Sequence, residues 1–205
     1  MLVNHPWRWV WLPLVVLCIS RQVSANTIHV DANVVGGLGN GTSWANAFAV
    51  LQDALDAASL GDDIWVAQGA YTPSEQTSGT DPRTATFLLP DGVRIYGGFA
   101  GVEQTLSDRD LGTYVTTLTG DLSGDDDTVG TAENAYHVVT ANGVGPGTVL
   151  DGFQIMAGNA DGWYANLDDH GGGMLVLGAA CTIRNCQFVE NNSSHRGGGL
   201  YNGSG

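Results

Sequence analysis

The sequence predicts an all-β fold, a right-handed parallel β-helix (a solenoid) with an N-terminal capping helix. Three observations predict it. Short strand-like segments separated by Gly, Asn and Asp turns follow one another from residue 62 onward. One of these segments recurs in aligned form, and a glycine triplet returns after 26 residues. A single amphipathic helix pattern precedes the strands, which is unlike a regular alternation of strands and helices.

Residues 1–25 have the pattern of a secretory signal peptide. Arg8 supplies a positive charge ahead of an apolar run over 9–19 that is too short to span a membrane. VSA at 23–25 is a small-residue cleavage site. The alternative is an N-terminal anchor helix, which Pro13 would interrupt. We expect a mature protein that is secreted, or held at the cell surface or outer membrane, with no membrane span.

The mature chain is strongly acidic. After residue 25 it has five arginines and no lysine against 21 Asp and Glu, a formal net charge of −16. Nucleic acids and anionic membrane surfaces are excluded as partners, because binding phosphate requires cations. The same charge permits Ca²⁺ to bind.

Residues 26–61 are expected to form the N-terminal cap, a strand over 27–32 followed by the helix over 42–59. Ser43 or Thr42 would cap this helix and Gly61 would end it. The apolar residues of its buried face are Phe48, Leu51, Leu55 and Ala58. An uncovered end of a strand stack recruits other strands, so this face should lie over the first coil.

Residues 62–205 are expected to form the coils of the solenoid. The window at 148–160 aligns with 181–193, apolar on apolar and Gln on Gln. The aligned pairs are Leu150 with Ile183, Phe153 with Cys186, Gln154 with Gln187, Ile155 with Phe188, and Asn159 with Asn192. Stacked in register about 4.8 Å apart, these pairs would form interior ladders and an asparagine ladder.

The glycine triplets at 171–173 and 197–199 indicate tight corners, where φ is positive or a Cβ has no room. The segment 161–170 between the two windows is expected to project as a loop. The last repeat has the character of an internal one, so we expect a C-terminally truncated stack, with further coils of a longer chain as its neighbour.

The motifs GGGM (171–174), GGGL (197–200) and FVEN (188–191) resemble the repeats of polymorphic outer membrane proteins and of secreted pectin-lyase-like β-helix proteins. The third motif residue is Gly where those repeats have Ala, and IMAG (155–158) stands where Phe-x-x-Asn would be. The resemblance implies the β-helix fold and an adhesin, a passenger domain or a polysaccharide-degrading enzyme. A lyase of this kind would use Ca²⁺-binding carboxylates and an arginine base on one face.

Two stretches contain candidate site residues. In 120–133, oxygen ligands for Ca²⁺ could come from Asp121, Asp125, Asp126 and Asp127. The spacing is not that of an EF-hand, and the alternative is a solvated acidic loop. In 161–170, a sugar-binding surface could come from Trp163, Tyr164, Asp168 and Asp169. Adjacent aspartates point apart, and the alternative is a loop that packs its own aromatics.

Three functions remain open from the sequence. The first is a non-catalytic, adhesin-like module that binds a carbohydrate or another cell-surface ligand. The second is a carbohydrate-active enzyme, either a polysaccharide lyase or a glycoside hydrolase. The third is a Ca²⁺-stabilised structural module. No catalytic or cofactor-binding residue is assigned, and Arg184 with Asp151 is expected to form an outward-facing ion pair between coils.

Overall fold

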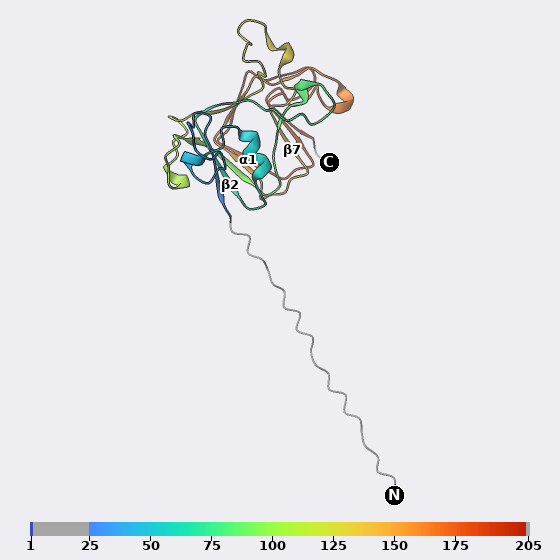
Figure 1. Cartoon of the computed structure of the whole chain (residues 1–205). Helices are drawn as coiled ribbons and strands as arrows, with labels where there is room; N and C mark the ends of the chain where they lie inside the picture. Colours follow the sequence, from blue (N-terminus) through green and yellow to red (C-terminus); the bar gives the residue numbers. More distant parts are fainter. Residues whose placement is uncertain (2–24, 204–205) are drawn as a thin grey trace.

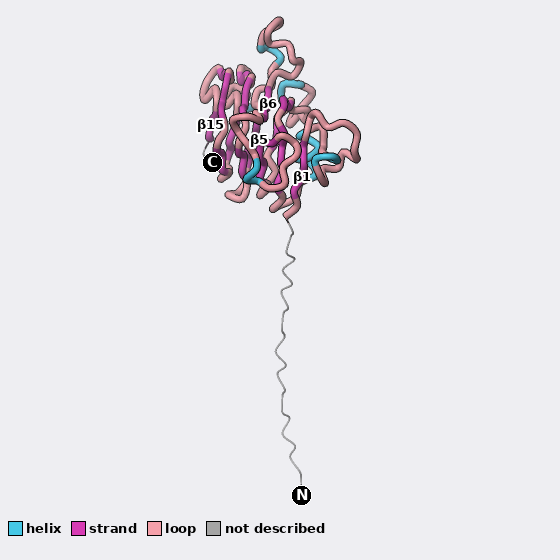
Figure 2. Tube along the Cα trace, turned by 90° about the vertical axis from the view of Figure 1, so that its left-hand side faces the viewer, coloured by secondary structure: helices cyan, strands magenta, loops and turns pink. Residues whose placement is uncertain are grey.

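A computed structural model describes Met1 and residues 25–203 of the chain (Figure 1). The predicted signal peptide lies outside these residues, apart from its first and last positions. All pairings between named strands of the described part are parallel. Figure 2 shows the strands side by side, with β1 and β15 toward opposite ends.

The strands form four sheets. The five-stranded sheet has the order β1 (Thr27–Val30), β2 (Asp63–Ala67), β5 (Arg94–Phe99), β8 (Val149–Asp151) and β12 (Thr182–Arg184). One four-stranded sheet, called the β3 sheet here, contains β3 (Gly69–Tyr71), β6 (Thr116–Thr119), β9 (Gln154–Met156) and β13 (Gln187–Val189). The other, called the β4 sheet, contains β4 (Phe87–Leu88), β7 (Val139–Asn142), β11 (Met174–Leu177) and β15 (Leu200–Gly203). A two-stranded sheet pairs β10 (Asn159–Ala160) with β14 (Asn192–Ser193).

The predicted fold class was wrong. The described strands belong to several separate parallel sheets with one α-helix, and they do not form a closed solenoid. Parallel strands need crossover connections, and here these are loops of unequal length. The loops carry the short 3₁₀ helices η1 (Trp44–Asn46), η2 (Pro82–Thr84), η3 (Leu106–Asp108), η4 (Thr131–Glu133) and η5 (Tyr164–Asn166). The alignment of two windows predicts which strands pair, but it does not predict the paths of the loops that connect them.

The predicted pairing of the two windows is confirmed at four positions. Leu150 lies opposite Ile183, and Ile155 lies opposite Phe188. Gln154 with Gln187 and Asn159 with Asn192 are also in register. The Nδ2 of Asn192 donates to Oδ1 of Asn159 at 2.9 Å, which is the expected asparagine ladder.

The glycine triplets serve the two purposes expected of them. Gly171 has a φ of +65°, a region that L-residues with a side chain rarely adopt. At Gly172, an added Cβ would lie 2.1 Å from the carbonyl oxygen of Asn192. The close approach of successive passes of the chain therefore requires glycine at this corner.

The helix is shorter than predicted. α1 spans Leu51–Ala57 with Val50 as N-cap, and neither Thr42 nor Ser43 caps it. The backbone of Phe48 instead pairs with β1, donating from its N–H to the His29 carbonyl at 2.9 Å. An extended residue at this position separates η1 from α1.

The core lies between the sheets and α1. Leu51 and Leu55 of α1 are buried in it, as predicted, while Phe48 is only partly buried. Leu150 and Ile155 are almost fully buried, and each such side chain contributes about 1.5–3 kcal/mol through the hydrophobic effect. Within the described residues, no helix has the length and apolar character that crossing a membrane would take.

Candidate functional site

An open groove of about 710 Å³ lies along the β4 sheet. One wall is the loop between β3 and β4. The other includes residues 161–170, called the insertion here, which carry η5. The floor comes from β7 and β11, through residues such as Thr140 and Asn142. The lining residues are Glu75, Gln76, Thr77, Ser78, Thr84, Thr86, Leu88, Tyr136, His137, Thr140, Asn142, Asn166, Asp168 and Leu175. Hydroxyl and amide groups dominate this lining, and it contains two carboxylates and no arginine.

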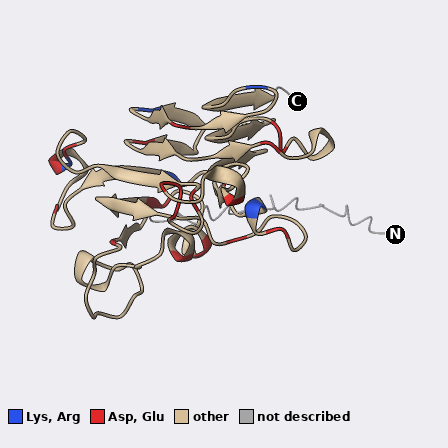
Figure 3. Cartoon of the chain, turned by 90° about the horizontal axis from the view of Figure 1, so that it is seen from above, with Lys and Arg blue, Asp and Glu red and all other residues tan. Residues whose placement is uncertain are grey.

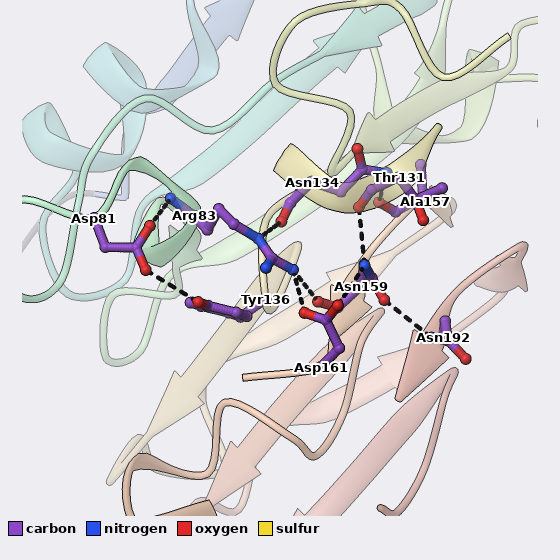
Figure 4. Close-up of polar contacts among 9 residues, drawn as sticks. All are labelled: Asp81, Arg83, Thr131, Asn134, Tyr136, Ala157, Asn159, Asp161 and Asn192. Atoms are coloured by element: carbon purple, nitrogen blue, oxygen red, sulfur yellow. Dashed lines mark hydrogen bonds and ion pairs between the residues drawn. The ribbon is translucent and has the colours of Figure 1, made fainter. Parts of the chain in front are cut away.

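Arg83 fixes the first wall of the groove in place (Figure 4). Its Nε donates to the Asn134 carbonyl at 2.7 Å, and its Nη2 donates to the Asn159 carbonyl at 2.8 Å. The same Nη2 forms an ion pair with Asp161 at 2.6 Å. The guanidinium also lies 4.2 Å from the ring centre of Tyr136, within the range of a cation–π interaction. One side chain thus joins three segments that are distant in sequence.

The insertion predicted to carry a ligand surface divides into two parts. Trp163 and Tyr164 are exposed, at 78% and 67%, and neither lines the groove. Asp168 lines the groove, whereas Asp169 is buried with its Oδ1 2.5 Å from Nδ1 of His170. The expectation that the adjacent aspartates point apart is consistent with these contacts, and the two are not a paired acid and base.

The acidic loop between β6 and β7 projects from the molecule (yellow in Figure 1). Figure 3, a cartoon coloured by residue type, shows acidic positions in several loops and few basic ones. Carboxylate oxygens of Asp121, Asp126 and Glu133 lie within 4.8 Å of one another. Asp121 also accepts backbone N–H groups, from Gly124 at 2.7 Å and from Asp125 at 3.2 Å.

Several oxygens of the cluster and of the adjoining Asp125 accept no hydrogen bond from the described residues. These buried oxygens are both carboxylate oxygens of Glu133, Oδ1 of Asp125 and Oδ1 of Asp126. Glu133 faces the carboxylates of Asp121 and Asp125, with which it can share a hydrogen bond only when it is protonated. Burial raises the pKa of Glu133 to about 6, with the charges of Asp121 and Asp125 adding to the effect. A proton on Glu133, or a cation bound among the carboxylates, would therefore reduce the electrostatic repulsion within the cluster.

The structure brings only some of the predicted Ca²⁺ ligands together. Asp121 and Asp126 belong to the cluster, Asp125 adjoins it, and Asp127 is exposed and outside it. The sequence did not predict Glu133, because it lies six residues beyond the run of aspartates and only the folding of the loop brings it to them. Position twelve counted from Asp121 holds Ala132, so a glutamate stands one residue beyond the place where an EF-hand has its own.

The expected pair of Arg184 and Asp151 forms, with Nε and Oδ2 2.9 Å apart. It does not face outward as predicted, because the Asp151 side chain is fully buried. Nη2 of Arg109 reaches the same oxygen at 2.7 Å, and Asn185 donates to the other at 2.7 Å. Burial raises the pKa of Asp151, but these hydrogen bonds and charges outweigh it and hold the pKa below the usual range.

Comparisons with protein-family models, with curated proteins and with solved structures found no match for this chain.

Proposed function

We propose that this protein is an extracellular, adhesin-like module that binds a carbohydrate in the groove along the β4 sheet. The observation that carries the proposal is the lining of that groove. Its hydroxyls and amides match the donors and acceptors of a sugar, and Tyr136 adds an aromatic ring.

The charges in the groove favour a neutral or amine-bearing glycan. Glu75 and Asp168 line it, and the lining includes no arginine to neutralise a uronic acid or a sulfate. The same absence weighs against a lyase acting here, since the resemblance implies an arginine base. We therefore favour the binding-module hypothesis over the enzyme hypothesis.

Asn142 offers a direct test of carbohydrate binding. Its side chain is exposed on β7 and lines the groove, so Asn142→Ala should leave the fold intact. We expect a glycan selected on an array to bind this variant about tenfold more weakly, as loss of one or two hydrogen bonds predicts. Gln187→Ala removes an exposed amide from the β3 sheet and should bind as the wild type does. Equal binding by both variants, or no glycan bound at all, would reject the groove as the site.

A second role, stabilisation by Ca²⁺, is favoured by the unpaired oxygens of Glu133. Ca²⁺ binds six to eight oxygen ligands, and carboxylates with no partner are available to it in the acidic loop. We expect the thermal midpoint to rise when Ca²⁺ is added after EDTA treatment, and to do so much less in Glu133→Gln. Asp127→Asn, outside the cluster, should respond as the wild type does. An unchanged wild-type midpoint would reject this role without affecting the groove.

A further inference from the structure

A second cluster of ligand atoms lies at the end of the insertion and shares no residue with the acidic cluster. It consists of one carboxylate and two imidazoles, from Asp169, His170 and His195, with one ligand atom of each within 4.8 Å of the others. Nε2 of His170 and Nδ1 of His195 are 3.0 Å apart. Neither histidine lines the groove, and the sequence alone assigned no role to either.

The backbone holds the two histidines together. His195 donates its N–H to the Asp169 carbonyl at 3.1 Å, and Gly171 donates to the Arg196 carbonyl at 2.9 Å. The segments at 169–171 and 195–196 thus belong to successive passes of the chain and are joined on both sides of the imidazole pair. Main-chain hydrogen bonds therefore fix the backbone positions from which the two imidazoles extend.

Asp169 determines which nitrogen of His170 is free. An ionised carboxylate only accepts hydrogen bonds, so the nitrogen 2.5 Å from its Oδ1, Nδ1 of His170, carries the hydrogen. In the neutral ring the lone pair then lies on Nε2, which faces His195. A carboxylate behind a histidine is the usual way to orient and strengthen a metal-binding imidazole.

The surroundings limit how far these rings can move. The ring of Tyr201 lies edge-on to His170 with centroids 4.5 Å apart, and Tyr164 packs against both histidines at 5.5–5.7 Å. The side chain of His170 is 3% exposed, whereas that of His195 is 42% exposed. An ion could enter from solvent on the His195 side.

We propose that Nε2 of His170 and Nδ1 of His195 bind a divalent transition-metal ion of the Zn²⁺ type. Two nitrogen ligands about 2.0–2.1 Å from a tetrahedral ion stand about 3.3 Å apart, so the pair must open by only a few tenths of an ångström. Asp169 orients His170 from behind through Nδ1 and does not itself bind the ion, so water would fill the remaining positions. Imidazole nitrogen is a poor ligand for Ca²⁺ and a good one for Zn²⁺, so this site and the acidic loop differ in the ions they select.

Metal binding is measured directly on residues 26–205, the predicted mature chain, by titration with Zn²⁺ and by the visible absorption of bound Co²⁺. We expect one ion per chain and a Co²⁺ spectrum typical of nitrogen ligands. Zn²⁺ should also raise the thermal midpoint, since an ion that binds only the folded state stabilises it.

The variant His195→Ala decides the proposal, because His195 is the exposed partner and its loss should not prevent folding. We expect at least a tenfold loss of Zn²⁺ affinity and no Zn²⁺-dependent rise of the midpoint. Ser194→Ala, exposed on the same turn, is the matched control and should keep both. The same Zn²⁺ affinity in His195→Ala and wild type, or no binding by the wild type, would show instead that the two imidazoles only share a hydrogen bond.

Discussion

Asp151 and Glu133 are carboxylates in contrasting surroundings. Asp151 is fully buried, yet two arginines and an asparagine satisfy its oxygens, and its pKa is held below the usual range. No N–H group of the described residues donates to the buried oxygens of Glu133, and its burial and the neighbouring acids raise its pKa to about 6. The pKa therefore follows the partners of the carboxylate and does not follow burial alone.

The contrast separates a structural acid from a candidate binding group. The charge of Asp151 is balanced by arginines of the chain itself, so it requires neither a proton nor a cation from solvent. In the described part of the chain, no arginine forms an ion pair with Glu133, so a proton or a cation that neutralises it has to come from solvent. This difference leads to predictions that test it, beginning with the largest effect.

Asp151→Asn should destabilise the fold most, by roughly 3 kcal/mol, because it leaves the largely buried Arg109 without its charge partner. Chemical denaturation at neutral pH measures the loss. The lowered pKa of Asp151 means that its contribution is present above its ordinary value of 3.8 and disappears as the pH falls through the folded-state value. The difference between variant and wild type should therefore shrink in acid. A variant as stable as the wild type at neutral pH would show that Asp151 is not the structural acid described here.

Glu133→Gln should stabilise the fold instead. In Ca²⁺-free buffer we expect a gain of roughly 1 kcal/mol at neutral pH, since the amide can donate to Asp121 or Asp125 where a carboxylate cannot. Because its folded-state pKa is raised, Glu133 makes the wild type lose stability as the pH rises from 4.5 to about 6.

Denaturation across that pH range checks the Glu133 prediction. The variant should lack the decline that Glu133 causes in the wild type. A variant that is less stable than the wild type in EDTA would contradict it and would indicate that the ionised Glu133 has a partner after all.

Arg184→Ala should have the smallest effect, below about 1 kcal/mol. Its side chain is 53% exposed and solvent screens it, while Arg109 continues to balance Asp151. The free energies of unfolding of Arg184→Ala and Arg109→Ala should be compared. Their difference measures how much more Arg109 than Arg184 stabilises the charge of Asp151. Equal losses in the two variants would contradict that order.

Strand pairing could be predicted from the sequence better than the arrangement of the loops that connect the strands. The pairing of Leu150 with Ile183 follows from side-chain pattern alone, because a strand shifted by one residue would expose its apolar face. The lengths and paths of the loops depend on contacts such as that of Arg83 with the Asn159 carbonyl, which leave no pattern in the sequence. The same holds for the sites, where Glu133 joins Asp121 only because the loop between them folds back.

The contacts of Arg83 also bear on how this surface can change during evolution. Two of its partners are main-chain carbonyl oxygens, at positions 134 and 159, which every amino acid possesses. Substitutions at those positions would keep the acceptors, whereas Arg83 has no equivalent replacement, since lysine lacks the planar, forked donor. Among diverged homologues, the arginine should persist while the residues that accept its hydrogen bonds vary.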